Sequence, residues 1–257
     1  MAFKLKILQN TYIDIHAHIS DRAFDRTREE LIKKLTGFIV LNSGENKDDN
    51  ERILEEYSLY PNLLPCVGLH PNEVVRYEQG QLLENMAYIQ DNIDEYFAVS
   101  EIGLDYQGKT DREINLEKDV LGRILDIAER HGKVCILHSR KSIEELIDLL
   151  RSYKVKAIIH NFEGNLSHLS KAIEINAFIS ISTSFLRFKR DNIIKNVPSS
   201  SLFFETDSPA LSPDTGINTP LNIISIIQYA ANLRKTSVEG LLESTNSNFI
   251  RLFGAGI

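Results

Sequence analysis

The stretch VCILHSRKSIEELIDLLRSYKVKAIIHNF, residues 134–162, contains one complete strand–helix–strand unit. Val134–Leu137 and Ala157–Ile159 are short runs rich in β-branched residues, which favour strands. Between them, Ile143–Leu150 repeats its apolar residues at helical spacing. A strand, a helix and a second strand in this order are typical of a parallel βαβ unit. The stretch therefore predicts an α/β fold built on a parallel sheet.

The same alternation continues on both sides of this unit. Amphipathic stretches at Glu51–Tyr57, Gln81–Asn92 and Asn115–Arg130 separate further strand candidates. Eight strands predict a single (β/α)₈ TIM barrel. A doubly wound open sheet is the second possibility, because periodicity does not reveal whether the last strand meets the first. The eight strand candidates are Tyr12–Ile15, Phe38–Leu41, Leu64–Val67, Phe97–Val99, Val134–Leu137, Ala157–Ile159, Phe178–Ile181 and Leu202–Phe204.

Two helical patterns follow the eighth strand candidate. A loop rich in proline and glycine, Ser208–Pro220, leads into Leu221–Arg234 and then Ser237–Leu252. We expect these patterns to form extra C-terminal helices. The sequence contains no linker or low-complexity tract, so residues 1–257 are predicted to form a single domain.

The overall composition is that of a folded protein that does not attract nucleic acid by its net charge. Of the 257 residues, 42% are hydrophobic, which excludes a disordered chain. There are 29 basic and 36 acidic residues, and the formal net charge is −7. A polyanionic partner would therefore need local cationic groups or bound metal.

The start of the chain and its cysteines indicate a cytoplasmic protein. The first residues, MAFKLKILQN, lack the long apolar run and the cleavage pattern of a signal peptide. No stretch approaches the ~20 apolar residues that a membrane span needs. Cys66 and Cys135 lie among apolar residues, so we predict buried free thiols in a reducing compartment.

Two histidines follow the first strand candidate in the sequence Asp14-Ile15-His16-Ala17-His18. Side chains alternate faces along a strand, so residues 14, 16 and 18 are expected to point the same way. The two imidazoles then stand close enough to chelate one divalent cation. Asp14 lies one step deeper, where its carboxylate can accept a hydrogen bond from an imidazole N–H and orient the ring.

An acidic residue, Glu101, stands at the end of the fourth apolar run. A buried carboxylate without a partner is costly, and a metal ion or another cation removes that cost. Its two oxygens can also bridge two cations. Asp105, four residues later, is either a second acidic group at the rim or a residue that caps a helix or turn.

The fifth and sixth strand candidates end in His138 and His160. The carboxyl ends of parallel strands converge at one end of a barrel, where catalytic groups gather. Together with the first two histidines and Glu101, these imidazoles are predicted to be metal ligands. Arg140 shares a face with His138, and its planar guanidinium can hold an anionic oxygen.

Two more acids, Glu205 and Asp207, follow the eighth strand candidate on one face. Asp207 is the better candidate at the mouth of the barrel, and Glu205 is expected to support it from below. His70 follows the third strand without a partner at chelating spacing, which favours substrate binding or support of a ligand. The remaining histidines, His131 and His168, are expected to be ordinary surface residues.

These motifs belong to a series that extends over nearly the whole chain. In order, the series is IDIHAHIS, VGLHPNE, SEIGLDY, ILHSRKS, IHNFEGN, ETDSPAL and the tail SNFIRLFG. It resembles the TatD family of metal-dependent deoxyribonucleases, which are amidohydrolase-like TIM barrels. In this chain Ala17 replaces a cysteine that is common in the family, and Ser100 replaces a glycine. Neither departure removes a proposed metal ligand.

The resemblance implies an enzyme with two divalent cations per chain. The nitrogen-rich ligand set suits Zn²⁺, whereas activity in the family is usually supported by Mg²⁺ or Mn²⁺. With Glu101 as the bridge, the implied ligands are His16, His18 and Asp207 for one cation and His138 and His160 for the other.

The activity implied by the resemblance is hydrolysis of DNA phosphodiester bonds by a metal-activated water. Asp207 is expected to orient that water and accept its proton, with Glu101 as the second catalytic residue. Arg140 and His70 are expected to hold phosphate oxygens. Because the protein itself is acidic, single-stranded DNA or a DNA 3′ end should bind only when the cations are present.

Two other functions are compatible with the sequence. The same metal pair can hydrolyse an acyl bond, such as an amide, a lactone or a D-aminoacyl-tRNA ester. The second alternative is a non-catalytic module that binds metal or nucleic acid. No membrane and no obligatory protein partner are expected.

Overall fold

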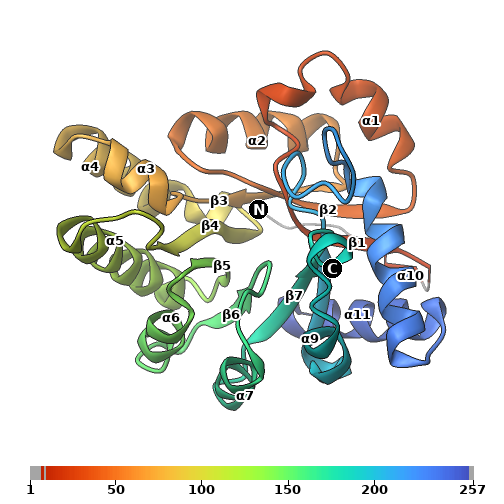
Figure 1. The fold of residues 1–257 in the computed structure, drawn as a ribbon. Coiled ribbons are helices and arrows are strands. Elements are labelled where there is room, and N and C mark those ends of the chain that lie inside the picture. Colours follow the sequence, from red (N-terminus) through yellow and green to blue (C-terminus); the bar gives the residue numbers. More distant parts are fainter. Residues whose placement is uncertain (1–6, 9, 255–257) are drawn as a thin grey trace.

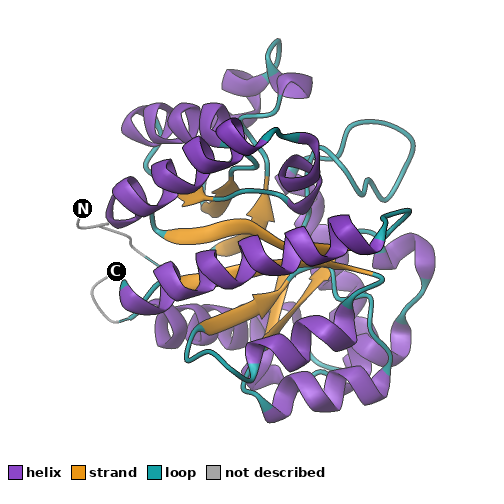
Figure 2. Ribbon diagram, turned by 90° about the vertical axis from the view of Figure 1, so that its left-hand side faces the viewer, coloured by secondary structure: helices purple, strands orange, loops and turns teal. Residues whose placement is uncertain are grey.

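The computed structural model describes residues 7, 8 and 10–254 and contains one sheet of eight parallel strands. Strand order in the sheet follows the order along the chain. In Figure 1 the strands surround a common axis and the helices form an outer ring, and in Figure 2 the strand arrows point toward the same end. The strands are β1 (Tyr12–Ala17), β2 (Phe38–Ser43), β3 (Leu63–Val67), β4 (Ala98–Asp105), β5 (Val134–Arg140), β6 (Lys156–Ile159), β7 (Phe178–Ser182) and β8 (Leu202–Glu205).

The first and last strands meet, which makes the fold a TIM barrel as predicted rather than an open sheet. The backbone N–H of Asp207 donates a hydrogen bond to the carbonyl of His16 at 3.0 Å. The backbone N–H of Thr206 donates to the buried carboxylate of Asp14 at 2.9 Å. These bonds join β1 to the segment that follows β8 and fix the position of Asp207.

Helices cover the outside of the barrel, and each predicted helical stretch corresponds to one of them, to within two residues at its start for the two C-terminal stretches. The longest, α5, begins at a capping box in which Thr110 and Glu113 each accept a hydrogen bond from the other's backbone N–H. Short 3₁₀ helices occur at Arg22–Phe24, Ile93–Glu95, Ser199–Ser201 and Pro220–Asn222. The α-helices are α1 (Arg28–Lys34), α2 (Lys47–Leu59), α3 (Pro71–Arg76), α4 (Gln79–Asn92), α5 (Asp111–Arg130), α6 (Ile143–Leu150), α7 (Leu166–Glu174), α8 (Phe185–Phe188), α9 (Asp191–Asn196), α10 (Ile223–Arg234) and α11 (Val238–Phe253).

Two hydrophobic clusters stabilise the barrel. The larger cluster fills the space between helices and strands, and the smaller one fills the barrel interior. Phe249 of α11 belongs to the interior cluster, so this C-terminal helix packs against the barrel core. Cys66 and Cys135 are buried free thiols, as predicted.

The two helices after β8 correspond to the predicted C-terminal patterns. Helix α11 begins where the hydroxyl of Ser237 accepts a hydrogen bond from the backbone N–H of Gly240 at 3.0 Å. Among the described helices, none combines the length and the apolar character that crossing a bilayer requires.

Candidate metal centre

The structure brings the six predicted metal ligands together around the carboxylate of Glu101. This side chain is only 3% exposed, and the two oxygens face different histidine pairs. Oε2 lies 3.4 Å from Nε2 of His16 and 3.3 Å from Nε2 of His18. Oε1 lies 2.7 Å from Nδ1 of His138 and 3.0 Å from Nε2 of His160. Glu101 therefore stands between two pairs of imidazoles, one from the start of the sequence and one from its middle.

Asp207 joins the first of these histidine pairs. Its Oδ1 atom lies 3.4 Å from Nε2 of His16 and 3.5 Å from Nε2 of His18. Its backbone adopts a left-handed conformation, with φ of 55°, just after the end of β8. Glu101, on β4, and Asp207, just after β8, thus approach the same two imidazoles.

Three of the histidines are held so that Nε2 faces the cluster. The Nδ1 atom of His18 lies 3.0 Å from the carbonyl oxygen of Ser43, which requires a proton on Nδ1. The Nδ1 atom of His160 lies 3.3 Å from the carboxylate of Glu205. The Nδ1 atom of His16 contacts the hydroxyls of Ser43 and Ser100 at 3.0 and 3.1 Å. Metal-binding histidines in proteins are held by their second nitrogen in this way.

The distances between ring nitrogens show that the residues present fit a divalent cation. Nε2 of His16 and Nε2 of His18 are 3.1 Å apart, and Nδ1 of His138 and Nε2 of His160 are also 3.1 Å apart. Two imidazole lone pairs repel one another at this distance unless a proton or a cation lies between them. Several sets of three ligand atoms, including His16, His18 and Asp207, lie within 4.8 Å of one another. Nitrogen and carboxylate ligands together suit Zn²⁺, Mn²⁺ or Fe²⁺.

Two irregularities in the sheet orient the ligands. The pairing of β1 with β2 shifts between Asp14 and Ala17, and the pairing of β4 with β5 shifts between Val99 and Ile102. His16 lies in the first irregular segment and Ser100-Glu101 in the second. An irregularity of this kind interrupts the simple alternation of faces and redirects a side chain.

The hydrogen-bond partner predicted for the carboxylate of Asp14, an imidazole N–H, is wrong. Its carboxylate accepts hydrogen bonds from the backbone N–H and the hydroxyl of Thr206, and its nearest bond to His16 involves the backbone N–H at 3.4 Å. The expectation assumed regular alternation from residue 14 to residue 16, and the shift in β1 removes that regularity. Asp14 therefore closes the barrel beneath the site and does not orient an imidazole.

Glu205 supports a ligand, but not the one expected. Its Oε1 atom accepts a hydrogen bond from the backbone N–H of Asn161 at 2.7 Å and lies 3.3 Å from Nδ1 of His160. The carboxylate thus orients the imidazole of His160 instead of supporting Asp207. The reason is that β6 and β8 both flank β7, so a long side chain at the end of β8 reaches the end of β6.

The two predicted substrate-binding residues take up different positions. His70 is buried, and Nε2 of its ring lies 3.6 Å from Oε1 of Glu101. Arg140 is 53% exposed at its side chain and lies 4.0 Å from Asp105. Asp105 combines both of its expected roles: it accepts a hydrogen bond from the backbone N–H of Gln107 in a turn, and it lies 3.8 Å from Nε2 of His138.

Three residues of the site were missed by the sequence analysis. The hydroxyls of Ser43 and Ser100 contact one another at 2.8 Å, and both contact His16. A carboxylate oxygen of Glu45 lies close enough to a ring nitrogen of His18 and a carboxylate oxygen of Glu101 to share a cation with them. The available signal for Ser43 and Glu45 was their position directly after the second strand candidate, Phe38–Leu41, where polar residues follow an apolar run.

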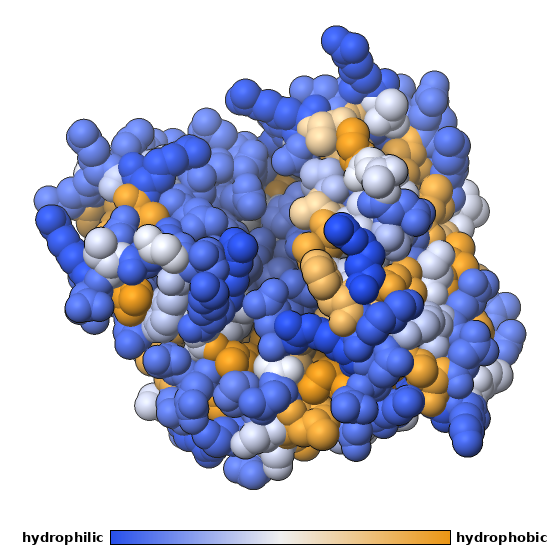
Figure 3. Space-filling model, viewed as in Figure 1, coloured by the Kyte–Doolittle hydropathy of each residue, from blue (hydrophilic) through white to orange (hydrophobic). Residues whose placement is uncertain are grey.

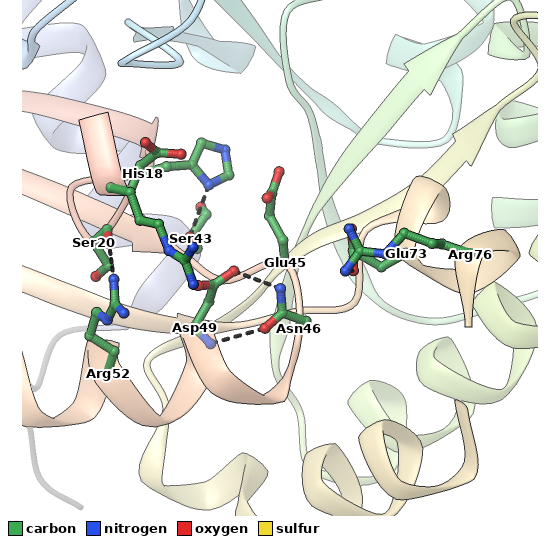
Figure 4. Close-up of a pocket in the computed structure, with 11 residues that line it drawn as sticks. His18, Ser20, Ser43, Glu45, Asn46, Asp49, Arg52, Glu73 and Arg76 are labelled. Carbon is green, nitrogen blue, oxygen red and sulfur yellow. Dashed lines mark hydrogen bonds and ion pairs between the residues drawn. The ribbon is translucent and has the colours of Figure 1, made fainter. Parts of the chain in front are cut away.

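Glu45 projects into a cleft beside the metal centre (Figure 4). The cleft has a volume of about 340 Å³ and extends from His18 to Arg76 of α3. Arg76 pairs with Glu73 at 2.7 Å, and Arg52 donates to the carbonyl of Ser20 at 2.9 Å. The figure shows both guanidinium groups turned to these partners. The cleft therefore has an acidic residue directed to the cluster, and two of its arginines, Arg52 and Arg76, are held by other groups.

The cluster keeps its carboxylates ionised. Burial alone would raise the pKa of Glu101, but the imidazoles of His70, His160 and His16 hold it well below its usual range. Burial has the same effect on Asp207, and hydrogen bonds from His16 and His18 hold its pKa well below the usual range too. Both groups are therefore available as anionic ligands at any working pH.

We predict that metal binding releases protons from the imidazoles. Burial alone would lower the pKa of His138, but the nearby carboxylates of Asp105 and Glu101 raise it to about 9. Below that pH His138 carries a proton that a cation must displace. The affinity for Zn²⁺ should therefore rise about tenfold per pH unit for each proton released, up to about pH 9. Calorimetry in buffers of different ionisation enthalpy measures the number of protons released, and a release of zero at neutral pH would contradict this account.

A TIM barrel with imidazoles and carboxylates gathered at the carboxyl ends of its strands defines the class of this protein. It is an enzyme, a metal-dependent hydrolase. The family model described as TatD related DNase matches residues 13–254. The chain belongs to this family, and the resemblance recognised from its motifs is confirmed.

Individual relatives agree with the family match. The chain is 29% identical over 257 residues to a human protein named deoxyribonuclease TATDN3, with 94% of each chain covered. It is 28% identical to an uncharacterized metal-dependent hydrolase of Methanocaldococcus jannaschii, covering 94% of this chain and 96% of that one. A crystal structure of YjjV, a TatD homologue from Escherichia coli, has a TM-score of 0.86 at 21% identity and covers 95% of this chain and 98% of that one. This last similarity concerns the fold alone.

Proposed function

We propose that this enzyme hydrolyses phosphodiester bonds of DNA with two divalent cations held by its histidine and carboxylate cluster. The observation that carries the proposal is the position of Glu101, with one oxygen toward His16 and His18 and the other toward His138 and His160. A carboxylate placed in this way suits two cations better than one. The names of the relatives, which include a human deoxyribonuclease, favour DNA as the substrate.

We assign one cation to His16, His18 and Asp207 and the other to His138 and His160, with Glu101 shared. A pair of divalent cations shields the charge on phosphate oxygens and makes a nearby water more acidic. Zn²⁺ and Mn²⁺ suit this ligand set better than Mg²⁺, because Mg²⁺ prefers oxygen ligands. The identity and number of the cations are part of the proposal.

The residues around the cluster are assigned the remaining tasks. Asp207 is ionised and accepts a proton from the attacking water at a carboxylate oxygen. His70 accepts a hydrogen bond from the backbone N–H of Asn72 through Nδ1 at 3.0 Å, so its proton is on Nε2, which faces the cluster. Burial lowers the pKa of His70 to about 4, so the ring stays neutral and donates to a phosphate oxygen. Arg140, at the rim, is available for the next phosphate along the strand.

The charge of the protein supports metal-dependent binding of a single-stranded DNA or a 3′ end. The formal net charge is −7, which includes the two ionised carboxylates of the cluster, Glu101 and Asp207. Without cations these carboxylates are offset by protonated imidazoles such as that of His138, whereas two divalent cations would make the local charge clearly positive and attract a phosphate backbone. We further propose that residues 1–257 act as one domain without an obligatory protein partner. The two buried free thiols favour a reducing compartment such as the cytoplasm.

A substrate panel on the metal-loaded enzyme tests the proposal. We expect hydrolysis of bis-p-nitrophenyl phosphate and of a labelled single-stranded oligonucleotide, and loss of both activities after chelation. An amide, a lactone and a D-aminoacyl-tRNA ester are the matched acyl substrates. If the enzyme hydrolysed an acyl substrate and showed no phosphodiesterase activity, acyl-bond hydrolysis would replace the proposed function.

A further inference from the structure

A second concave region opens beside the metal centre, between α8 and the loop that follows β8. It encloses about 870 Å³. Ser184, Arg187 and Phe188 line one side, and residues 209–216 line the other. We call this region the α8 groove.

Both walls of the α8 groove are linked to residues of the histidine and carboxylate cluster. Pro209, on one wall, is two residues beyond Asp207. Ser184, on the other wall, donates a hydrogen bond from its hydroxyl to the side-chain carbonyl of Asn161 at 3.0 Å, and Asn161 directly follows His160. Both walls are therefore attached to proposed metal ligands, one from each cation site.

An aromatic ring is exposed in this groove although its helix is well anchored. Phe188 is 63% exposed, whereas Phe185, at the start of the same short helix, is 1% exposed and belongs to the core. The helix is thus held by one aromatic residue and presents another to solvent. Figure 3 shows hydrophobic residues on the right-hand rim of the otherwise hydrophilic hollow on this face.

The segment around this ring is basic in an acidic protein. Arg187, Lys189 and Arg190 follow one another closely, and Arg187 and Lys189 are exposed. The guanidinium of Arg187 lies 5.6 Å from the centre of the Phe188 ring. Among the residues that line the groove, Asp214 is the acidic one. Exposed aromatic rings beside cations are what proteins use to bind single-stranded nucleic acid, because bases stack on the rings and phosphates pair with the cations.

We propose that Phe188 stacks against an unpaired nucleobase next to the scissile phosphate while Arg187 contacts the DNA backbone. This inference rests on the proposed function and assigns its preference for single strands to one side chain: a base in a duplex is already stacked on both faces, so only an unpaired base can stack on Phe188. The chemistry of stacking is tolerant of base identity, so little sequence preference is expected.

The test compares Phe188→Ala and Phe188→Tyr with the wild-type enzyme, all loaded with Mn²⁺. The probe is a short single-stranded phosphorothioate oligonucleotide with one 2-aminopurine, whose fluorescence is quenched on stacking. Phe188→Ala should bind about tenfold more weakly and lose the quenching, and Phe188→Tyr should retain both. The control is Leu59→Ala, which removes a 71% exposed apolar side chain at the C-terminal end of α2.

Two further measurements separate this inference from the proposed function. Hydrolysis of a fully abasic oligonucleotide, which offers Phe188 no aromatic group, should be equal in the wild type and all three variants. An oligonucleotide with an abasic site at the probe position should bind the wild type and Phe188→Ala equally.

Wild-type affinity and quenching in the folded Phe188→Ala variant would overturn the stacking assignment, even if phosphodiesterase activity is present. Conversely, binding that depends on Phe188 in an enzyme without phosphodiesterase activity would overturn the proposed function and leave the stacking site in place.

Discussion

Replacing Glu101 with alanine is expected to lower phosphodiester turnover by about a thousandfold or more. The carboxylate lies within 3.4 Å of four imidazoles, and its ion-pair partners among the described residues are all histidines. Without it, no group joins the two halves of the cluster. A metal pair contributes several kcal/mol of transition-state stabilisation, which corresponds to a loss of this size.

The control for this variant is Glu163→Ala, an exposed carboxylate on the loop that follows β6. This substitution changes the net charge by the same amount as Glu101→Ala, and it should leave turnover of bis-p-nitrophenyl phosphate unchanged. Circular dichroism and thermal unfolding verify that both variants are folded, which we expect because the hydrophobic clusters do not include residue 101. Normal turnover by a folded Glu101→Ala protein would refute the bridging role.

The second large effect is expected for Asp207→Asn. The variant keeps the shape of the side chain but removes the proton acceptor, so kcat should fall by about 10²- to 10⁴-fold. Because the backbone N–H of Asp207 is held by the carbonyl of His16, the position of the residue should be preserved. KM for bis-p-nitrophenyl phosphate should change much less than kcat if metal is retained.

Asp214→Asn is the matched control for this substitution, because Asp214 is exposed on the same loop after β8. Its kcat for bis-p-nitrophenyl phosphate should equal that of the wild type. Metal content must be measured for both proteins, since Asp207 is also a proposed ligand. A folded, metal-loaded Asp207→Asn enzyme with wild-type kcat would show that another group accepts the proton.

The barrel could be predicted from the sequence because each strand leaves a local signal. All eight strand candidates coincide with observed strands, although β4 extends from Ala98 to Asp105 where the apolar run predicted Phe97–Val99. The difference arises because Ser100 and Glu101 interrupt the apolar pattern while the backbone continues as a strand. The polar residues of the predicted site thus caused the strand to be predicted too short, since the apolar pattern does not indicate that a strand continues through polar residues.

The ligand cluster was predictable for a related reason, and its supporting residues were not. His16, His138 and His160 lie at strand ends, and parallel strands bring their ends together whatever the length of chain between them. The partners of these rings depend on side-chain reach between neighbouring strands. Ser100 contacts His16 across 84 positions of sequence, and Glu205 contacts His160 across 45.

The position of Asp14 shows the limit of periodicity most clearly. Alternation placed Asp14 on the same face as the first histidine, and the shift in register within β1 directs its carboxylate to Thr206 instead. An irregularity of one residue leaves no trace in the pattern of apolar residues. Its consequence is nevertheless large, because it decides whether a buried acid supports a ligand or closes the barrel.

The account depends on the claim that imidazoles and carboxylates from distant parts of the chain hold two divalent cations for phosphodiester hydrolysis. The most direct test is metal content by mass spectrometry, measured on the same samples as phosphodiesterase activity, for the wild type and Glu101→Ala. The account predicts two equivalents of divalent metal per active wild-type chain and a loss of both metal and activity in the variant. An active wild-type enzyme without bound metal, or a variant with two equivalents and full activity, would contradict it.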